Sequence, residues 1–240
     1  MIEPNMVPDP VKKDSQSKCE SRVLKIRLLG RISFDNALLI QEKAISEFKS
    51  TGKGLPLILS LEHDPVITCG RSTNPANLLL SEKEYSERGI EVRKIDRGGD
   101  VTYHGPGQVV IYPILALRDH GLRVTEYVEL LEEAMIFTCG DFGIDAFRRE
   151  GMRGCWTEGG KIGAVGTAVK AGGITKHGLA FNVNPDLEHF GLIVPCGIKN
   201  YPVTRLVDLT NEALSLSGVE NKLLMHLSGL LGLKAEFDMP

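Results

Sequence analysis

The run RGGDVTYHGPGQ, residues 97–108, constrains this chain more than any other stretch, because it holds four glycines, one proline, one arginine and one histidine. Such a composition does not build a core, but glycines let a backbone adopt positive φ and approach a ligand closely. Strand-like segments flank the run at Glu91–Ile95 and Val109–Leu115. We therefore expect a binding loop held by a sheet at both ends. The alternative is a connection without a role; the phosphate-binding patterns GxGxxG and GxxxxGK[ST] do not occur.

The chain has 240 residues, which is enough for one large domain with a sizeable core. Its net charge of −3 argues against nucleic acid or an anionic membrane surface as the main partner. No apolar run approaches the roughly 18 residues that a membrane span needs. An odd number of widely spaced cysteines without CxxC argues against a disulfide framework or a structural zinc site and favours a reducing compartment. The cysteines are Cys19, Cys69, Cys139, Cys155 and Cys196.

Residues 1–21 are polar, carry three prolines and lack the apolar segment of a secretory signal. Their acidic residues argue against a transit peptide, so we predict a disordered tail before a single domain of residues 22–240. Within that domain, hydrophobic periodicity and turn residues predict the following elements. Strands are expected at Val23–Leu29, Leu55–Leu61, Glu91–Ile95, Val109–Leu115 and Gly178–Val183, with a hairpin over Gly154–Lys170 that turns at Glu158–Gly160. Helices are expected at 33–52 with Ser33 as N-cap and Gly52 as stop, at 78–87, at 125–140 with Thr125 as N-cap, and at 211–231 with a break near Gly218; a helical turn is expected at 186–190 and a tight loop at 194–198.

Two groups of polar residues have competing interpretations. His63 lies between two acids in EHDP, and we interpret it as a surface histidine paired with a carboxylate, with a role in a site as the alternative. The predicted helix at 125–140 carries four glutamates in its first half, which suits the positive end of the helix dipole. We interpret them as a solvated face rather than a metal site. They are Glu126, Glu129, Glu132 and Glu133.

Cys196 stands out among the cysteines because Pro195 and Gly197 place it in a turn. Buried and inert is the usual state of a cysteine, and we expect it for Cys69, Cys139 and Cys155. Cys196 is instead a candidate nucleophile, provided that a nearby cation favours its thiolate. Candidate cations are His177, His189, Lys161 and Lys176, and spacing does not choose between them.

Lys161 lies in GGKIGAVG, among small residues that allow close approach of a neighbouring group. A solvated hairpin lysine is the alternative. His104 and His177 each lie beside a glycine, which leaves room for a ligand. Neither has a metal-ligand spacing such as HExxH, so we expect no metal.

Taken in order, RGGDVTYHGPGQ, KIGAVG, KHGLAFNVN and VPCGI closely resemble the lipoyl(octanoyl) transferases, the octanoyl-[acyl carrier protein]:protein N-octanoyltransferases of lipoate biosynthesis. LEHDPVITCGR resembles an early segment of the same family, and the resemblance covers residues 25–215. It implies an α/β (α+β) fold, related to the catalytic domains of lipoate- and biotin-protein ligases, with a large mixed sheet, a small sheet and packed helices.

The resemblance also implies roles for individual residues. Cys196 matches the acyl-thioester nucleophile, and Lys161 matches the lysine that lowers its pKa. Three stretches match the substrate-binding segments, namely Arg97, Gly98, Gly99, Asp100, Val101, Thr102, Tyr103 and His104, then Ala164, Val165 and Gly166, then Gly178, Leu179 and Ala180. The segment 170–176 is slightly expanded relative to the family.

The implied reaction passes an octanoyl group from acyl carrier protein to Cys196 and then to a lysine of a lipoyl domain, in 2-oxoacid dehydrogenase E2 subunits or the glycine cleavage H protein. Because a thioester is already activated, neither ATP nor another cofactor is expected, and the expected location is the cytoplasm. The alternatives are an ATP-dependent lipoate- or biotin-protein ligase, a non-catalytic acyl-carrier-binding module, and a cysteine hydrolase.

Overall fold

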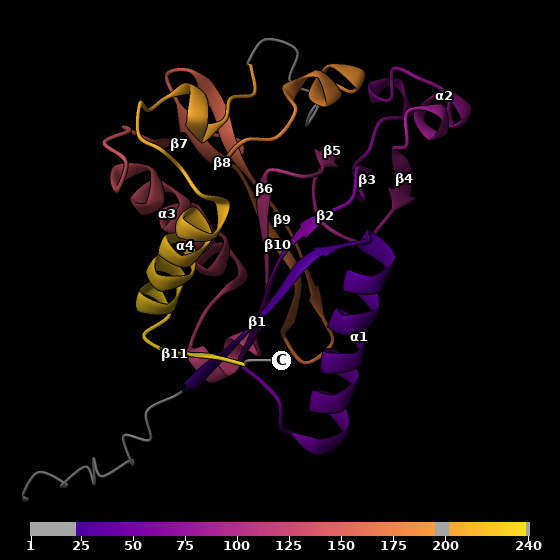
Figure 1. Ribbon diagram of the computed structural model, residues 1–240. Coiled ribbons are helices and arrows are strands. Elements are labelled where there is room, and N and C mark those ends of the chain that lie inside the picture. The colour runs from indigo at the N-terminus through magenta and orange to yellow at the C-terminus, as the bar shows by residue number, and fades with distance from the viewer. Residues whose placement is uncertain (1–22, 195–201, 239–240) are drawn as a thin grey trace, which may run out of the picture.

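The computed structural model describes residues 23–194 and 202–238 (Figure 1). A large mixed sheet forms its centre, with the strand order β11-β1-β2-β6-β10-β9-β8-β7. The strands β11, β1 and β2 are parallel, and every other neighbouring pair is antiparallel. The strands are β1 (Val23–Ile32), β2 (Leu57–His63), β6 (Gln108–Ile114), β7 (Phe147–Arg149), β8 (Met152–Thr157), β9 (Gly160–Lys170), β10 (Ile174–Asn182) and β11 (Lys234–Phe237).

A small sheet of β3 (Val66–Cys69), β4 (Glu91–Lys94) and β5 (Val101–His104) lies beside the large one, in the order β4-β3-β5. The expectation of a loop throughout 97–108 is therefore wrong for its middle, where β5 pairs antiparallel with β3. Val101 and Tyr103 alternate into the core of the small sheet, with 0% and 1% of their surface exposed. β-branched and aromatic residues favour this half-buried extended conformation.

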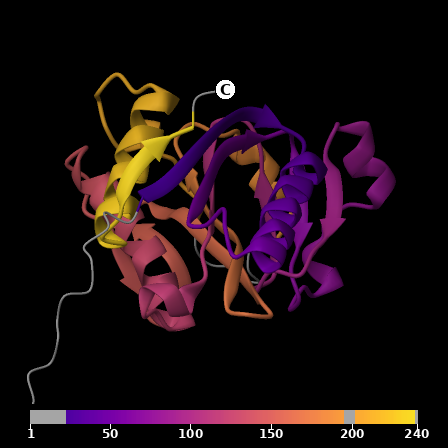
Figure 2. The same cartoon turned by 90° about the horizontal axis from the view of Figure 1, so that it is seen from below.

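Helices cover both faces of the large sheet, as Figures 1 and 2 show. α1 (Phe34–Thr51) packs on one face, and α3 (Val124–Gly140) and α4 (Leu216–Leu230) pack together on the other. The short α2 (Glu82–Glu87) belongs to the small-sheet side. This arrangement confirms the expected α/β class with two sheets. Short 3-10 helices are Pro75–Asn77, Leu117–His120, Leu187–Leu192 and Leu206–Asp208.

The ends of α1 follow from local sequence and confirm the prediction. Ser33 Oγ accepts a hydrogen bond from the Asn36 backbone N–H at 3.3 Å, which satisfies one of the free donors of the first turn. Gly52 ends the helix at φ 69°, and its N–H donates to the Phe48 carbonyl. A left-handed residue at this position is usually glycine.

The first residues of α3 and α4 differ from the prediction, because side chains bond to backbone N–H groups at positions other than the predicted ones. α3 begins at Val124 rather than after Thr125, since Glu126 turns back to accept from the Arg123 N–H at 2.8 Å. α4 begins only at Leu216, and no break occurs at Gly218, whose N–H is taken up by Ser215 Oγ at 3.1 Å.

The remaining elements agree with the sequence more closely. The hairpin of β8 and β9 turns between Thr157 and Gly160, as predicted, and Asp186 caps the helical turn Leu187–Leu192. The predicted helix at 78–87 is shorter, because Ser81 caps α2. The predicted N-terminal tail, and all but the first residue of the loop 194–198, lie outside the described residues.

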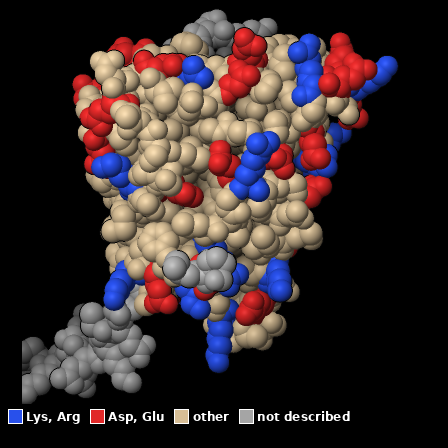
Figure 3. Space-filling model, in the orientation of Figure 1, with Lys and Arg blue, Asp and Glu red and all other residues tan. Residues whose placement is uncertain are grey.

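No helix within 23–194 and 202–238 is both long and apolar enough to cross a membrane. Basic and acidic side chains are interspersed on the face shown in Figure 3.

Candidate functional site

A pocket that opens to solvent lies between the two sheets beside the start of α1. We call it the glycine-lined pocket. All three predicted substrate-binding stretches contribute to its wall. The second and third stretches lie side by side, because Ala164 of β9 pairs with Ala180 of β10 and Gly166 pairs with Gly178. The Gly98 N–H donates to the Thr167 carbonyl at 2.8 Å and thereby joins the first stretch to β9. The predicted residues on the wall are Arg97, Gly98, Gly99, Asp100, Thr102, His104, Ala164, Val165, Gly166, Gly178, Leu179 and Ala180.

Two residues of the predicted stretches do not line this pocket. Val101 faces the core of the small sheet, and Tyr103 lines a neighbouring pocket described below. Sequence reasoning in turn missed three wall residues, which are Phe34, Ile95 and Tyr112. His177 also lies on the wall, in agreement with the room for a ligand that its adjacent glycine indicated.

Two glycines are required by close approach of other atoms. A Cβ at Gly166 would lie 2.8 Å from Arg97 Cδ, and a Cβ at Gly178 would overlap the Ile111 carbonyl oxygen and lie 2.7 Å from Pro113 Cδ. At Gly98, by contrast, the nearest atom to a Cβ would be the Thr167 carbonyl oxygen at 3.5 Å, an ordinary van der Waals distance, so close approach does not require a glycine there.

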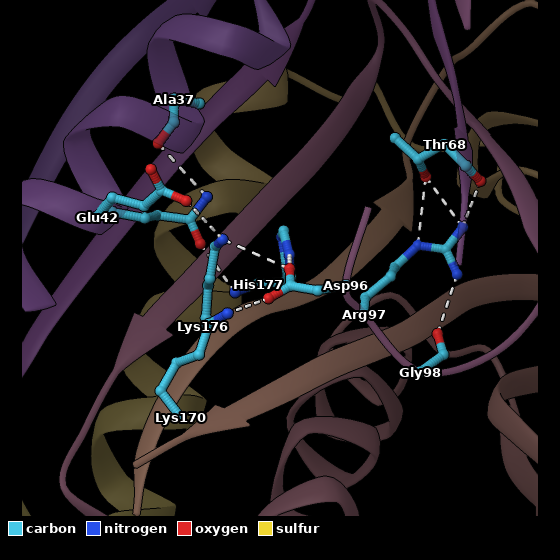
Figure 4. A network of polar contacts seen from close by, with 10 residues as sticks. Ala37, Glu42, Thr68, Asp96, Arg97, Gly98, Lys170, Lys176 and His177 are labelled. Carbon is cyan, nitrogen blue, oxygen red and sulfur yellow. Dashed lines mark hydrogen bonds and ion pairs between the residues drawn. The ribbon is translucent and has the colours of Figure 1, made fainter. Parts of the chain in front are cut away.

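Arg97 is 6% exposed, and its guanidinium holds the small sheet against the glycine-rich run (Figure 4). Its Nη2 donates to the Thr68 carbonyl at 2.5 Å and to Thr68 Oγ1 at 3.0 Å, while Nη1 donates to the Gly98 carbonyl at 3.0 Å. These bonds fix the backbone of residues 97–98, which forms part of the pocket wall.

Asp96 lies at the centre of a polar network on the other side of the same segment (Figure 4). It forms an ion pair with Lys170 and contacts Lys176 Nζ at 3.4 Å and His177 Nε2 at 2.9 Å. Partial burial opposes ionisation, but the hydrogen bonds from Lys170 and His177 and the charge of Lys176 hold the pKa of Asp96 well below its usual range. The carboxylate therefore joins the strand before Arg97 to β9 and β10.

Three histidines form a buried histidine cluster, defined as His63, His104 and His177. Ring centroids of His63 and His104 lie 5.9 Å apart, and Tyr112 contacts both His63 and His177. Burial lowers their pKa values to about 4, 3 and 4, respectively. All three are therefore neutral at pH 7.

The interpretation of His63 as a surface residue is wrong. In a strand, neighbouring side chains point to opposite faces, so the acids on either side of His63 turn away from it. Its ring is fully buried and hydrogen-bonds to Tyr112 Oη at 2.7 Å and to the Ile32 carbonyl at 3.2 Å. Glu62 Oε2 instead accepts from the Gly107 N–H, and Asp64 pairs with Arg31.

Lys161 lies in a second pocket, which we call the lysine pocket. Thr102, Ala164 and Ala180 line both pockets, so the two are neighbours along β9 and β10. The remaining residues of the lysine pocket are Tyr103, Gln108, Gly163, Asn182, Phe190 and Val203.

The environment of Lys161 excludes the solvated-hairpin interpretation. The residue is 8% exposed, and its Nζ lies 5.3 Å from the centroid of the Trp156 ring, a cation–π distance. Its N–H donates to the Pro202 carbonyl at 2.9 Å, and its carbonyl accepts from the Thr204 N–H at 3.0 Å. These bonds hold the chain that follows residues 195–201 against β9.

A buried glutamate holds the backbone at Gly154, which lies against the Lys161 side chain. Glu132 of α3 is 1% exposed and accepts from the Gly154 N–H at 2.8 Å, while Arg148 and Arg153 pair with it. Gly154 has φ 123°, and a Cβ there would lie 2.7 Å from Lys161 Cε. The interpretation of the glutamates of α3 as a solvated face is therefore wrong for Glu132.

Comparison with known proteins identifies the family. The sequence matches the lipoyl protein ligase A/B catalytic domain over residues 35–228. The octanoyltransferase of Chloroflexus aurantiacus is 41% identical over 219 residues, which cover 90% of this chain and 98% of the relative. The chain belongs to the lipoyl(octanoyl) transferase family. It is thus an acyltransferase. A second relative, the octanoyltransferase of Acidobacterium capsulatum, is 45% identical over 197 residues, which cover 77% of this chain and 79% of the relative.

Solved structures agree on the fold of this acyltransferase. A lipoate-protein ligase A bound with ATP has a TM-score of 0.71 and 19% identity, and the match covers 89% of this chain and 87% of that one. A bi-partite lipoate protein ligase from Thermoplasma acidophilum has a TM-score of 0.68 and 17% identity, over 90% and 87% of the two chains. At these identities the likeness concerns the fold.

Cys196, the predicted nucleophile of this acyltransferase, lies outside the described residues. The other candidates can be placed. As predicted, Cys69, Cys139 and Cys155 are buried. Of the candidate cations, Lys176 and His177 belong to the Asp96 network. Their partners on β9 lie seven and six residues from Lys161, or about 20–23 Å at roughly 3.3 Å per residue.

His189, the remaining candidate cation, lies nearer to the lysine pocket. Its Nδ1 is 2.8 Å from the hydroxyl of Tyr103, which lines that pocket. Burial raises the pKa of Tyr103 to about 12, so its hydroxyl stays protonated. No group of three His, Cys, Asp or Glu side chains in the described part of the chain is placed to hold a metal ion.

Proposed function

We propose that this acyltransferase transfers an octanoyl group from acyl carrier protein to the lysine of a lipoyl domain, through a thioester on Cys196. The observation that carries the proposal is the adjacency of the two pockets. One brings together the three stretches that match the family's acyl-binding segments, and the other contains Lys161. The name of the relative at 41% identity over nearly its full length supports octanoyl as the acyl group.

In the first step, the Cys196 thiolate attacks the thioester carbon of octanoyl-carrier protein and expels the carrier thiolate. A thiol with a pKa near 8.5 is mostly protonated at neutral pH. An adjacent ammonium favours the thiolate, and at about 4 Å with an effective dielectric near 20 the attraction is worth roughly 4 kcal/mol before desolvation is subtracted. Lys161 takes this role in the proposal, and its ammonium donates a proton to the departing carrier thiolate.

In the second step, the ε-amine of the acceptor lysine attacks the octanoyl-Cys196 thioester. An amide forms, the cysteine thiolate departs, and Lys161 accepts the proton that the amine loses. Dividing the transfer into two thioester attacks replaces one difficult reaction with two easier ones. The proposal needs no ATP, metal or other cofactor, because the donor is already a thioester.

The position of the chain after Cys196 supports the pairing of this cysteine with Lys161. Pro202, six positions beyond Cys196, is hydrogen-bonded to the Lys161 backbone, and Val203 lines the lysine pocket. Before the cysteine, the Val194 N–H donates to the Asn77 carbonyl at 2.9 Å. The proposal extends to a single catalytic domain over residues 22–240, to a cytoplasmic location, and to acceptors in 2-oxoacid dehydrogenase E2 subunits and the glycine cleavage H protein.

An acyl-transfer assay tests the function. Purified protein is mixed with octanoyl-carrier protein and a lipoyl domain, without ATP, and the lipoyl domain is weighed by mass spectrometry. The proposal predicts an octanoylated domain, and no product with the Cys196→Ala variant. Transfer of free octanoate that requires ATP would instead indicate a ligase, release of octanoate alone a hydrolase, and binding without any product a carrier-binding module.

A further inference from the structure

One residue of β10 breaks the usual alternation of side chains along a strand. Regular alternation places neighbouring residues on opposite faces. Lys176 and His177 nevertheless both contact α1. Lys176 Nζ lies 3.0 Å from Glu42 Oε1. The His177 ring stacks on the Phe34 ring, with the ring centroids 6.3 Å apart and an angle of 16° between the planes. The reason is a φ of 60° at His177, the one non-glycine residue with positive φ in the ranges 23–194 and 202–238.

Several contacts hold the His177 ring in this unusual orientation (Figure 4). Its backbone N–H donates to Gln41 Oε1 at 2.8 Å, and Nε2 lies 2.9 Å from Asp96 Oδ1. Both His177 and Gln41 are buried. A left-handed conformation at a residue other than glycine persists where its surroundings determine it, and such residues gather at functional sites.

The register of β9 and β10 gives the position of this ring along the glycine-lined pocket. The pair Ala164–Ala180 borders the lysine pocket, and the pair Thr167–His177 lies three residues farther along the ladder, or about 10 Å at roughly 3.3 Å per residue. An octanoyl chain has seven C–C bonds of about 1.5 Å, and its extended zigzag spans about 9 Å. A chain that enters at Ala164–Ala180 therefore meets His177 and Phe34 with its terminal methyl group.

We propose that the His177 ring, backed by Phe34, closes the far end of the acyl site and sets eight carbons as the preferred chain length. A longer chain must displace a ring that is stacked on one side and hydrogen-bonded on the other. His177 thus acts as a specificity-determining residue. The proposal rests on the proposed function, and it names the substrate class that the site accepts.

Chain-length preference in binding tests the proposal without any transfer step. In the Cys196→Ala background, calorimetry compares octanoyl-, decanoyl- and dodecanoyl-pantetheine. We expect octanoyl to bind at least tenfold more tightly than decanoyl. In His177→Gly the order should reverse, with decanoyl about 15-fold tighter than octanoyl, because each of two newly accommodated methylenes contributes about 0.8 kcal/mol.

The variants are chosen to separate the ring from the fold. Glycine adopts positive φ without strain, so His177→Gly removes the ring and keeps the backbone. His177→Asn also tolerates this conformation and should shift the preference part of the way. In the matched control, Lys170→Met removes a partner of Asp96 outside the pocket and should leave the order of the chains unchanged.

A His177→Gly protein that melts at the parent temperature and keeps the parent order of chains would overturn the proposal. If the glycine variant does not fold, His177→Asn provides the test. A folded His177→Asn protein that keeps the parent order of chains would then overturn the proposal. Failure of the wild-type protein to octanoylate a lipoyl domain would overturn the proposed function, whereas the binding order tests the role of His177 separately.

Discussion

Gly107 provides a sharp test of how the glycine-rich run is built into the fold. Its φ is 88°, and a Cβ there would overlap the main-chain carbonyl of Asn184 and lie 2.7 Å from the Pro185 nitrogen. Its carbonyl accepts from the Val183 and Asn184 N–H groups at 3.1 and 2.9 Å, so the two segments cannot separate freely. In Gly107→Ala we expect about 1–2 kcal/mol from the left-handed conformation. The overlap with backbone atoms adds about 1–3 kcal/mol.

The total loss of about 2–5 kcal/mol should appear in urea unfolding followed by the fluorescence of Trp156, the single tryptophan, which is 1% exposed. Gly89→Ala is the matched control, because Gly89 has φ 69° with nothing within 4 Å of a built Cβ. It should lose only the conformational part, about 1–2 kcal/mol. Equal losses in the two variants would refute the argument from close packing.

Three further predictions concern the site. Gly99→Ala, at φ 84° in the pocket wall, should reduce acyl transfer more than it lowers the melting temperature; proportional losses would assign Gly99 a purely structural role. Lys161→Met should raise the alkylation pKa of the Cys196 thiol and slow transfer roughly 100-fold or more, and Lys161→Arg should restore part of the pKa shift but little turnover. An unchanged alkylation pKa would contradict this role. The buried histidine cluster should make the protein less stable from pH 7 to 5, because the unfolded chain takes up protons below pH 6.5 whereas the folded pKa values lie at about 3–4. Each histidine accounts for at most about 2 kcal/mol in urea unfolding. His63→Gln should flatten the slope of stability against pH, and a slope equal to that of the parent protein would contradict the assignment.

Local signals predicted the parts of the structure that local interactions build. Ser33 and Gly52 enclose α1 in sequence as they do in space, and Lys161 was singled out by the small residues around it. The glycines of β9 and β10 also indicated where another segment approaches, since Gly166 lies against Arg97.

Features that depend on distant residues escaped sequence reasoning. The strand β5 forms by pairing with β3, and the residues of β5 alone do not indicate that pairing. Glu132 is buried because Arg148 and Arg153 approach it from β7 and β8, which a helical pattern does not reveal. The left-handed φ of His177 was hidden for the same reason, because it depends on contacts with Gln41 and Asp96.

Intact-mass analysis after incubation with octanoyl-carrier protein alone tests the central claim most directly. The account predicts one added octanoyl group per chain, located on Cys196 by peptide mapping and lost when a lipoyl domain is added. Absence of any adduct, or an adduct that persists in the Cys196→Ala variant, would contradict the account.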